Sequence, residues 1–191
     1  MKYDKNYLRK VFLLRRKKKY PKKNKFNSDL LFKLIKRQFH NKKITIGGYY
    51  PSYYEVDVTN FLKEAIKKKF KIALPVLQTS NLMCFRSWNT KEPLYINKFG
   101  MLEPENKKKE IFPDIIIVPL VAFDNQLNRI GYGKGYYDRY LRKIRKIKGK
   151  AIFLGMAYYF QKCKNIPIKK HDFKLDYIFT ERGLISSKNK L

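Results

Sequence analysis

The residues best suited to chemistry lie near the middle of the chain, in the stretch NRIGYGKGYYDRYL at positions 128–141. Glycines at alternate positions let a backbone approach a ligand closely and direct its N–H groups at phosphate oxygens. Arg129 and Lys134 would add full positive charges, and the N-terminus of a following helix would add a favourable dipole. The stretch therefore predicts a phosphate-binding loop, with a purely structural turn as the alternative.

Asp138 is the acidic group of this stretch. A carboxylate that only faced phosphate would repel it, but a magnesium ion between them removes the conflict, because Mg²⁺ binds both kinds of oxygen. The spacing fits neither common phosphate motif. A Walker loop needs Ser or Thr where Gly135 follows Lys134, and the dinucleotide fingerprint needs its third glycine one position later than Gly135. The loop alone therefore does not identify a reaction.

The residues around the loop predict the sheet that must position it. The stretch DIIIVPLVAF at 114–123 is almost wholly apolar, which is typical of a central strand covered on both faces. A helix is predicted after the glycine loop, and a loop and helix within residues 53–70. Further strands are predicted at residues 43–51, 71–77, 82–88, 150–158 and 175–181. This alternation favours an open α/β sheet with a mostly parallel centre, in which ligands bind beyond the carboxyl ends of the strands.

Two helices are predicted before the first strand. Residues 3–16 form a basic amphipathic pattern, and Ser28 can cap a second helix that reaches Phe39. Because Pro21 and Asn24 interrupt the pattern between them, the two helices are expected to form an N-terminal helical hairpin. Residues 101–113 are predicted to be a charged, proline-bounded loop.

The composition bounds the class of protein. A chain of 191 residues with 44% hydrophobic residues can fold, and its length requires only one domain, residues 1–191. The net charge of +30 favours anionic partners: nucleic acid, phosphorylated or polycarboxylate small molecules, or an anionic membrane surface. The alternative is a compositional drift towards lysine on solvated faces.

Cysteine content and apolar runs indicate the compartment. Cys84 and Cys163 are far apart and lack neighbours at metal-ligand spacing, so both are expected to be buried and reduced. The longest apolar run, at 115–123, is far shorter than the ~20 residues that span a bilayer. These features predict a soluble, cytoplasmic protein without membrane partners.

The stretch LVAFDNQLNRIGYGKGYYDRYL at 120–141 resembles the signature of the 5-formyltetrahydrofolate cyclo-ligase family, also called methenyltetrahydrofolate synthetases. That signature reads Ala-Phe-Asp and then Arg-x-Gly-x-Gly-x-Gly-Tyr-Tyr-Asp-Arg. Other family features occur in the family's order along the chain: Lys5, Arg9, Tyr49, Pro51, Glu55, Asp57, Leu74-Pro75, Met83, Phe85, Glu103-Pro104, Gln161, Pro167 and His171-Asp172. One position departs from the pattern, because Leu127 stands where the family usually has glycine. The turn there is expected to use Asn125 or Asn128, which tolerate left-handed geometry.

The resemblance implies a Rossmann-like three-layer α/β/α fold and an ATP- and magnesium-dependent ligase. Such an enzyme converts 5-formyltetrahydrofolate to 5,10-methenyltetrahydrofolate and releases ADP and phosphate. In the mechanism proposed for the family, the formyl oxygen is phosphorylated, nitrogen 10 attacks to close the ring, and phosphate leaves. Phosphoryl transfer depends mainly on positioning and on neutralising charge. A monomer is expected.

The resemblance also implies roles for individual residues. Lys134 and Arg129 would be catalytic, Asp138 and Asp172 would hold magnesium, and Tyr50, Glu55 and Tyr136 would bind the folate. Glu55 suits this role because a carboxylate can accept hydrogen bonds from pterin N–H groups. ATP would contact two segments: Lys5, Asn6, Tyr7, Leu8 and Arg9, and then Arg129, Ile130, Gly131, Tyr132, Gly133, Lys134, Gly135, Tyr136 and Tyr137.

Several of these residues have plainer alternatives. Lys5 and Arg9 could be a solvated helix face, Asp172 could cap a turn, and His171 suits a loop hydrogen bond better than a catalytic base. Trp88 could stack on the pterin or belong to the core.

A rival hypothesis is a basic nucleic-acid-binding protein. The runs RRKKKYPKKNK, IKKKF and RKIRKIKGK could neutralise a phosphate backbone. These runs lie on several predicted elements, however, and no known nucleic-acid-binding motif accompanies them. We therefore expect such binding only as a non-specific effect of charge.

Overall fold

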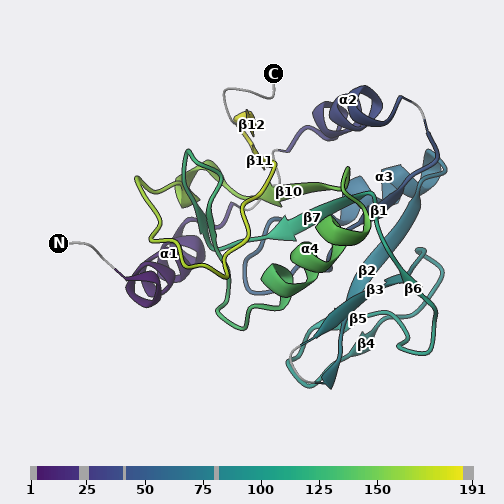
Figure 1. Ribbon diagram of the computed structural model, residues 1–191, viewed down its shortest axis with the longest axis horizontal. Helices are drawn as coiled ribbons and strands as arrows, with labels where there is room; N and C mark the ends of the chain where they lie inside the picture. Colours follow the sequence, from purple (N-terminus) through teal and green to yellow (C-terminus); the bar gives the residue numbers. More distant parts are fainter. Residues whose placement is uncertain (1–3, 22–25, 41, 80–81, 187–191) are drawn as a thin grey trace.

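The computed structural model describes residues 4–21, 26–40, 42–79 and 82–186 (Figure 1). Within them, an eight-stranded sheet has the order β12-β11-β10-β7-β1-β2-β3-β6. Neighbouring strands from β11 to β2 are parallel, whereas β12, β3 and β6 are antiparallel to theirs. The strands are β1 (Thr45–Gly47), β2 (Lys71–Leu77), β3 (Met83–Ser87), β6 (Glu110–Ile111), β7 (Ile115–Pro119), β10 (Ile152–Met156), β11 (Tyr177–Thr180) and β12 (Gly183–Ser186). The predicted mostly parallel sheet is confirmed.

Helices and two small sheets surround this sheet. The helices are α1 (Lys5–Lys19), α2 (Ser28–Phe39), α3 (Thr59–Lys67), α4 (Tyr136–Ile147) and the short 3₁₀ helix η2 (Tyr159–Gln161). One small sheet pairs β4 (Tyr95–Ile96) with β5 (Leu102–Glu103), and the other pairs β8 (Ala122–Phe123) with β9 (Arg129–Ile130). The region 101–113 thus contains β5 and β6 besides loop, and β12 was not predicted.

The two faces of the sheet carry separate helical layers, because successive side chains of a strand point to opposite faces. In β7, Ile115 and Ile117 pack in a core shared with α2 and α3, whereas Ile116 and Val118 pack in a core shared with α4. All four are at most 2% exposed. The Rossmann-like α/β/α sandwich is therefore confirmed, and the central strand is covered on both faces as its composition predicted.

The predicted N-terminal hairpin is wrong in its packing, although both helices exist. Phe12 of α1 packs with Val121, Ala122 and Ile130 in a third core, and α1 contacts β8 and η2. The apolar stripe of α2, in contrast, faces the sheet together with α3. Figure 1 shows α1 and α2 on opposite sides of the molecule. Each helix buries its own stripe against a different surface, which the spacing of apolar residues alone does not reveal.

The predicted long strand 114–123 is divided in two. β7 ends at Pro119, which has no N–H to donate to a neighbouring strand, and the chain then leaves the central sheet. β8 pairs instead with β9, so that a hairpin delivers the glycine loop beyond the carboxyl end of β7. In the turn of this hairpin it is Leu127 that takes the left-handed conformation, with φ 65°, and not Asn125 or Asn128 as expected.

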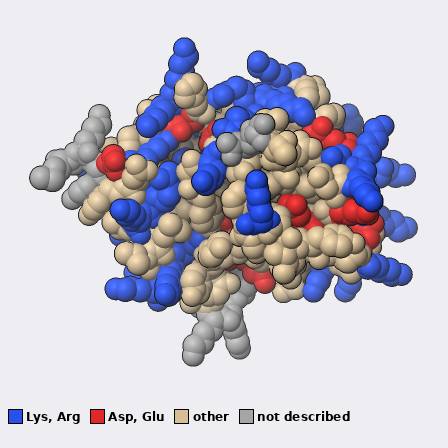
Figure 2. All heavy atoms as spheres, turned by 90° about the horizontal axis from the view of Figure 1, so that it is seen from below, with Lys and Arg blue, Asp and Glu red and all other residues tan. Residues whose placement is uncertain are grey.

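The chain is strongly basic, with a net charge of +30, and Figure 2 shows many Lys and Arg side chains on one face, mainly toward its edges. None of the described helices has the length and apolar content of a membrane span. Cys84 is buried as expected, whereas Cys163 is only partly buried.

Candidate active site

A cleft of about 1020 Å³ lies beyond the carboxyl ends of β1, β2 and β7. The start of α1, the loop 49–55, the β4–β5 hairpin and the glycine loop enclose it. Most predicted site residues line it: Lys5, Asn6, Arg9, Tyr50, Glu55, every residue from Arg129 to Asp138, and Asp172. Tyr7 and Leu8 do not, because the Tyr7 side chain is 48% exposed and Leu8 packs against the third core.

The glycine loop depends on two glycines for its shape. Gly133 and Gly135 have φ values of 98° and 70°, which side chains rarely tolerate. A Cβ atom on Gly133 would lie 3.2 Å from Cζ of Arg9, and Arg9 Nε donates a hydrogen bond to the Gly131 carbonyl at 2.8 Å. The loop therefore folds closely over the Arg9 guanidinium. Helix α4 begins after Gly135 without a side-chain cap, which leaves its first N–H groups for an anionic ligand.

Lys134 projects from the middle of this loop. Its side chain is exposed, and its ammonium makes no ion pair with the described part of the chain. Its carbonyl accepts a hydrogen bond from Arg139 Nη2 at 2.7 Å, which fixes the backbone at this point. A charge on a fixed backbone, next to open cleft, is suited to an incoming phosphate group.

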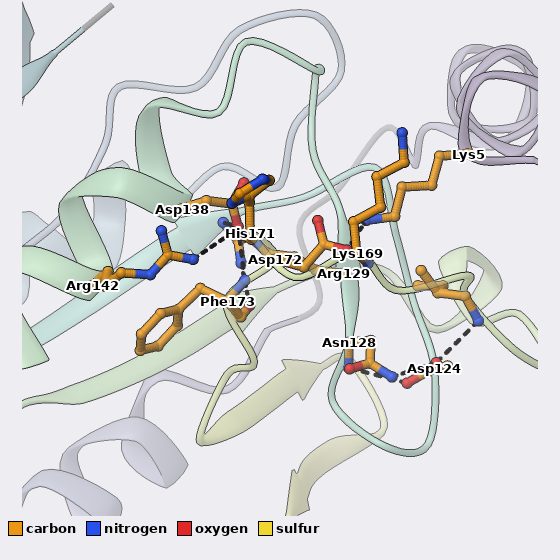
Figure 3. Close-up of polar contacts among 11 residues, drawn as sticks. Lys5, Asp124, Asn128, Arg129, Asp138, Arg142, Lys169, His171, Asp172 and Phe173 are labelled. Carbon is orange, nitrogen blue, oxygen red and sulfur yellow. Dashed lines mark hydrogen bonds and ion pairs between the residues drawn. The ribbon is translucent and has the colours of Figure 1, made fainter.

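Arg129 lines the cleft and connects three segments of the chain (Figure 3). Its Nη1 donates to the Phe173 carbonyl at 2.6 Å, and its Nη2 lies 2.8 Å from Asp138 Oδ1. Asp138 Oδ1 also accepts from the Phe173 N–H at 3.0 Å. The Arg129 side chain is only 4% exposed, so this arrangement joins β9, α4 and the segment before β11. Asp138 Oδ2 accepts no hydrogen bond from the described residues.

Asp172 pairs with the first helix. Its Oδ2 contacts Lys5 Nζ and accepts a hydrogen bond from the Lys169 N–H at 2.5 Å, while Oδ1 has no such partner among the described residues. Partial burial raises the pKa of this carboxyl, but the hydrogen bonds from Lys5 and Lys169 outweigh burial, and the pKa is lowered from its ordinary value. Asp172 is therefore anionic at neutral pH.

The metal-ligating groups of the described residues include no cluster of three or more His, Cys, Asp or Glu. Asp138 and Asp172 nevertheless both line the cleft, and Asp138 Oδ2 and Asp172 Oδ1 accept no hydrogen bond from the described residues. Mg²⁺ commonly takes one or two carboxylates and completes its octahedron with phosphate oxygens and water. The donor set therefore fits magnesium bound together with a phosphate ligand.

Glu55, from the loop 49–55, also lines the cleft and is 6% exposed. Its Oε2 accepts a hydrogen bond from the Ser52 N–H at 2.9 Å. Burial raises the pKa of this carboxyl, and the Ser52 N–H, the Arg16 charge and the Tyr132 hydroxyl oppose that rise without cancelling it. Tyr50 is on the same loop and 39% exposed. A buried carboxylate that lines a cleft is suited to accept hydrogen bonds from N–H groups of a ligand.

For Trp88 and His171 the structure agrees with the plainer of the alternatives that the sequence left open. Trp88 packs against the first core, donates a hydrogen bond to the Glu92 carbonyl at 3.2 Å and does not line the cleft. The His171 carbonyl accepts from Arg142 Nη2 at 2.8 Å, in agreement with a loop role. Phe99 and Met101 of the β4–β5 hairpin supply apolar lining that the sequence reasoning missed.

Arg16 was also missed, because it opens the basic run RRKKK and resembles a solvated lysine-rich end of a helix. It is 1% exposed. The available signal was its spacing: Arg16 lies one turn after Phe12, on the buried side of α1.

The fold and the cleft define an α/β enzyme with its site at the carboxyl edge of the sheet, and comparisons with known proteins agree. The model of the 5-formyltetrahydrofolate cyclo-ligase family matches residues 1–181. A 5-formyltetrahydrofolate cyclo-ligase of Mycoplasma genitalium is 35% identical over 186 residues, which cover 92% of this chain and 96% of that protein. A probable 5-formyltetrahydrofolate cyclo-ligase of Schizosaccharomyces pombe is 32% identical over 145 residues, covering 69% and 71%.

Solved structures give the same result. The 5,10-methenyltetrahydrofolate synthetase of Aquifex aeolicus matches with a TM-score of 0.77 and 29% identity, covering 96% of this chain and 93% of that chain. The corresponding protein of Mycoplasma pneumoniae matches with a TM-score of 0.70 and 26% identity, covering 94% and 99%. The chain belongs to the 5-formyltetrahydrofolate cyclo-ligase family.

Proposed function

We propose that the protein, as one domain of residues 1–191, converts 5-formyltetrahydrofolate to 5,10-methenyltetrahydrofolate with ATP and Mg²⁺ and releases ADP and phosphate. The observation that carries the proposal is the meeting of three groups of residues at one cleft. These are the basic start of α1, the glycine loop before α4, and the loop that bears Tyr50 and Glu55. Elements far apart in the chain thus supply a phosphate side and a folate side.

The phosphate side is built for charge neutralisation. The exposed ammonium of Lys134 and the uncapped N-terminus of α4 would receive the transferred phosphoryl group, and Lys5 and Arg9 would receive the remaining phosphates. Arg129 is held by Asp138 and Phe173, so its catalytic role includes fixing Asp138. Mg²⁺, when bound by Asp138 and Asp172, would neutralise phosphate charge.

The folate side would hold the pterin. Glu55 would accept hydrogen bonds from pterin N–H groups, while Tyr50, Tyr136 and the apolar side chains of Met83, Phe99 and Met101 would surround the ring. In the reaction, the formyl oxygen attacks the terminal phosphorus of ATP and ADP leaves. Nitrogen 10 then attacks the formyl carbon, loses its proton, and the phosphorylated oxygen departs as phosphate.

The deciding experiment is spectrophotometric. The purified protein is incubated with 5-formyltetrahydrofolate, ATP and Mg²⁺, and the near-ultraviolet absorbance of the methenyl product is followed. We expect an increase that requires both ATP and Mg²⁺. A protein that is folded by circular dichroism and gives no ATP-dependent signal would refute the proposal.

The remaining parts of the proposal concern its setting. We expect a cytoplasmic monomer whose partners are small molecules, and non-specific nucleic-acid binding only as an effect of the +30 charge. Salt-dependent binding of random single-stranded RNA, measured beside the activity assay, tests the rival hypothesis. Tight RNA binding without cyclisation of 5-formyltetrahydrofolate would favour the nucleic-acid-binding hypothesis over the proposed enzyme activity.

A further inference from the structure

Arg16 is buried at the last turns of α1, behind the wall of the cleft. Its guanidinium donates from Nη2 to the Tyr53 carbonyl at 2.6 Å and from Nη1 to the Leu120 carbonyl at 3.3 Å. Nη2 also contacts the hydroxyl of Tyr132, and Cζ lies 5.5 Å from the centroid of that ring. One side chain therefore reaches the folate-side loop, the end of β7 and the glycine loop.

The loop that Arg16 reaches is strained. Tyr53 and Tyr54 both have left-handed backbone conformations, with φ 47° and 64°. Such conformations cost free energy for residues with a side chain and persist only where the surroundings hold them. The bond from Arg16 to the Tyr53 carbonyl is placed to hold this pair. Directly after it, Glu55 is held by Ser52 through two bonds, from the Ser52 N–H to Oε2 and from the Glu55 N–H to the Ser52 carbonyl, both 2.9 Å.

The other contact of Arg16 reaches the glycine loop. Tyr132 stands between Gly131 and Gly133, its hydroxyl contacts Arg16, and burial together with the charge of nearby Glu55 raises the pKa of that hydroxyl. Tyr132 is 40% exposed and lines the cleft, whereas the guanidinium that it contacts is buried. Arg16, Tyr132 and Glu55 thus connect the two walls of the site.

A purely structural role explains Arg16 poorly. Its Nε has no hydrogen-bond partner among the described residues, and its guanidinium forms no ion pair within hydrogen-bonding distance there. A buried cation with an unpaired N–H is costly, and an apolar side chain of similar volume usually serves packing as well or better. Arg16 does not line the cleft, so direct contact with a ligand does not explain it either.

We propose that Arg16 is a positioning residue, which holds the folate-side loop and the glycine loop in their binding geometry through Tyr53 and Tyr132. The inference rests on the proposed function. Without Arg16, the free enzyme would populate relaxed loop conformations, and ligands would have to restore the competent one. The apparent affinity for a ligand equals the intrinsic affinity multiplied by the fraction of molecules in the competent conformation. Saturating ligand, in contrast, returns all molecules to that conformation.

The test compares Arg16→Met with Lys17→Met, a control on the exposed face of the same helix. In steady-state assays, Arg16→Met is expected to raise KM for 5-formyltetrahydrofolate by about 10- to 100-fold, the effect of losing a hydrogen bond to a charged group, with a smaller loss of kcat. Simple loss of folded protein would lower apparent kcat and leave KM unchanged. An unchanged KM in Arg16→Met, in an enzyme whose wild type is active, overturns the inference. An inactive wild type instead refutes the proposed function.

Two further variants keep the test decisive if Arg16→Met does not fold. Arg16→Lys keeps the charge but lacks the planar fork that reaches both acceptors, so KM should still rise. Tyr132→Phe removes only the bridging hydroxyl from a partly exposed ring. The effects of Arg16→Lys and Tyr132→Phe on KM should be less than additive in the double variant, because both break one connection. Full additivity, or a wild-type KM in Arg16→Lys, overturns the inference.

Discussion

The ammonium of Lys5 contacts the carboxylate of Asp172, although 167 residues separate them in the chain. The contact joins the first turn of α1 to the loop before β11, and both residues line the cleft. Two residues whose sequence positions suggested a solvated helix face and a turn are thus a single cross-link of the site. A phosphate ligand with Mg²⁺ would find a cation and an anion already placed to receive it.

This contact predicts how acid affects stability. Because the folded-state pKa of Asp172 is lowered, its ionised form stabilises the fold above its unfolded-state pKa, and that contribution is lost as pH falls through the folded value. We expect Asp172→Asn to show a shallower loss of Tm on acidification than the wild type, measured by circular dichroism. Asp29→Asn, at an exposed aspartate of α2, is the control and should follow the wild type. Identical acid profiles for all three proteins would contradict the assignment.

Lys134→Ala should affect catalysis and not folding. The side chain is exposed and unpaired with any described carboxylate, so under the proposed function its loss would remove charge stabilisation of the moving phosphoryl group and few other interactions. We expect kcat to fall by about 100- to 1000-fold, as on loss of one key donor to a developing charge. Lys146→Ala, at an exposed position of α4, controls for the loss of net charge. A kcat within a few-fold of the control would exclude Lys134 from the transfer step.

Asp138→Asn separates metal binding from structure. The substitution keeps the shape but removes the charge that faces buried Arg129, so the free energy of unfolding should fall by about 1–3 kcal/mol. If Asp138 also holds magnesium, the Mg²⁺ concentration at half-maximal rate should rise by about 10-fold or more. Titration of the initial rate with Mg²⁺ measures this. If the variant is destabilised but needs the same Mg²⁺ concentration as the wild type, Asp138 does not bind magnesium and serves only as the structural partner of Arg129.

Glu55 predicts a pH dependence of folate binding. Its raised pKa means that the protonated acid becomes populated at a higher pH than for an ordinary glutamate, and the protonated form accepts fewer hydrogen bonds from pterin N–H groups. We expect KM for 5-formyltetrahydrofolate to rise as the pH falls from neutral to mildly acid. In Glu55→Gln the KM should be high and nearly independent of pH, whereas Glu64→Gln, exposed on α3, should keep the wild-type profile.

Much of the fold follows from local pattern. The β2 bounds at 71–77 match the prediction, and the start of α4 follows from the glycines before it and the apolar stripe within it. Periodicity could not reveal where Pro119 would end β7, because the apolar run continues through it into β8. Which surface buries α1 and α2 is likewise a tertiary outcome, since both stripes have similar spacing.

The candidate site was predictable wherever residues form a compact motif. The glycine loop was found from spacing, and Glu55 and Asp172 only through the family resemblance, because they are far from it in the chain. The spacing of Arg16 from Phe12 indicated the buried side of α1, but the partners of its guanidinium, the Tyr53 carbonyl and the Tyr132 hydroxyl, come from distant segments that the spacing does not reveal. The left-handed pair at Tyr53 and Tyr54 also carries no sequence signal, since tyrosine does not favour that conformation.

Leu127 allows a direct test of whether its left-handed backbone conformation is strained. It combines a left-handed conformation, φ 65°, with a fully buried side chain in the core shared with α4, at 1% exposure. Leu127→Ala should cost about 2–5 kcal/mol because it leaves a cavity and keeps the unfavourable backbone. Leu127→Gly leaves a similar cavity but removes a backbone penalty of roughly 1–2 kcal/mol, so it should be the more stable of the two.

That order is the reverse of the usual one, in which glycine is less stable than alanine by roughly 0.5–1 kcal/mol. Leu120 supplies the matched control, because it is equally buried but is not among the residues with positive φ. Urea unfolding of the four variants should therefore rank Gly above Ala at position 127 and Ala above Gly at position 120. If Ala is more stable than Gly at position 127 as well as at position 120, the backbone of Leu127 is not strained, and the turn before the glycine loop accepts leucine without a free-energy cost.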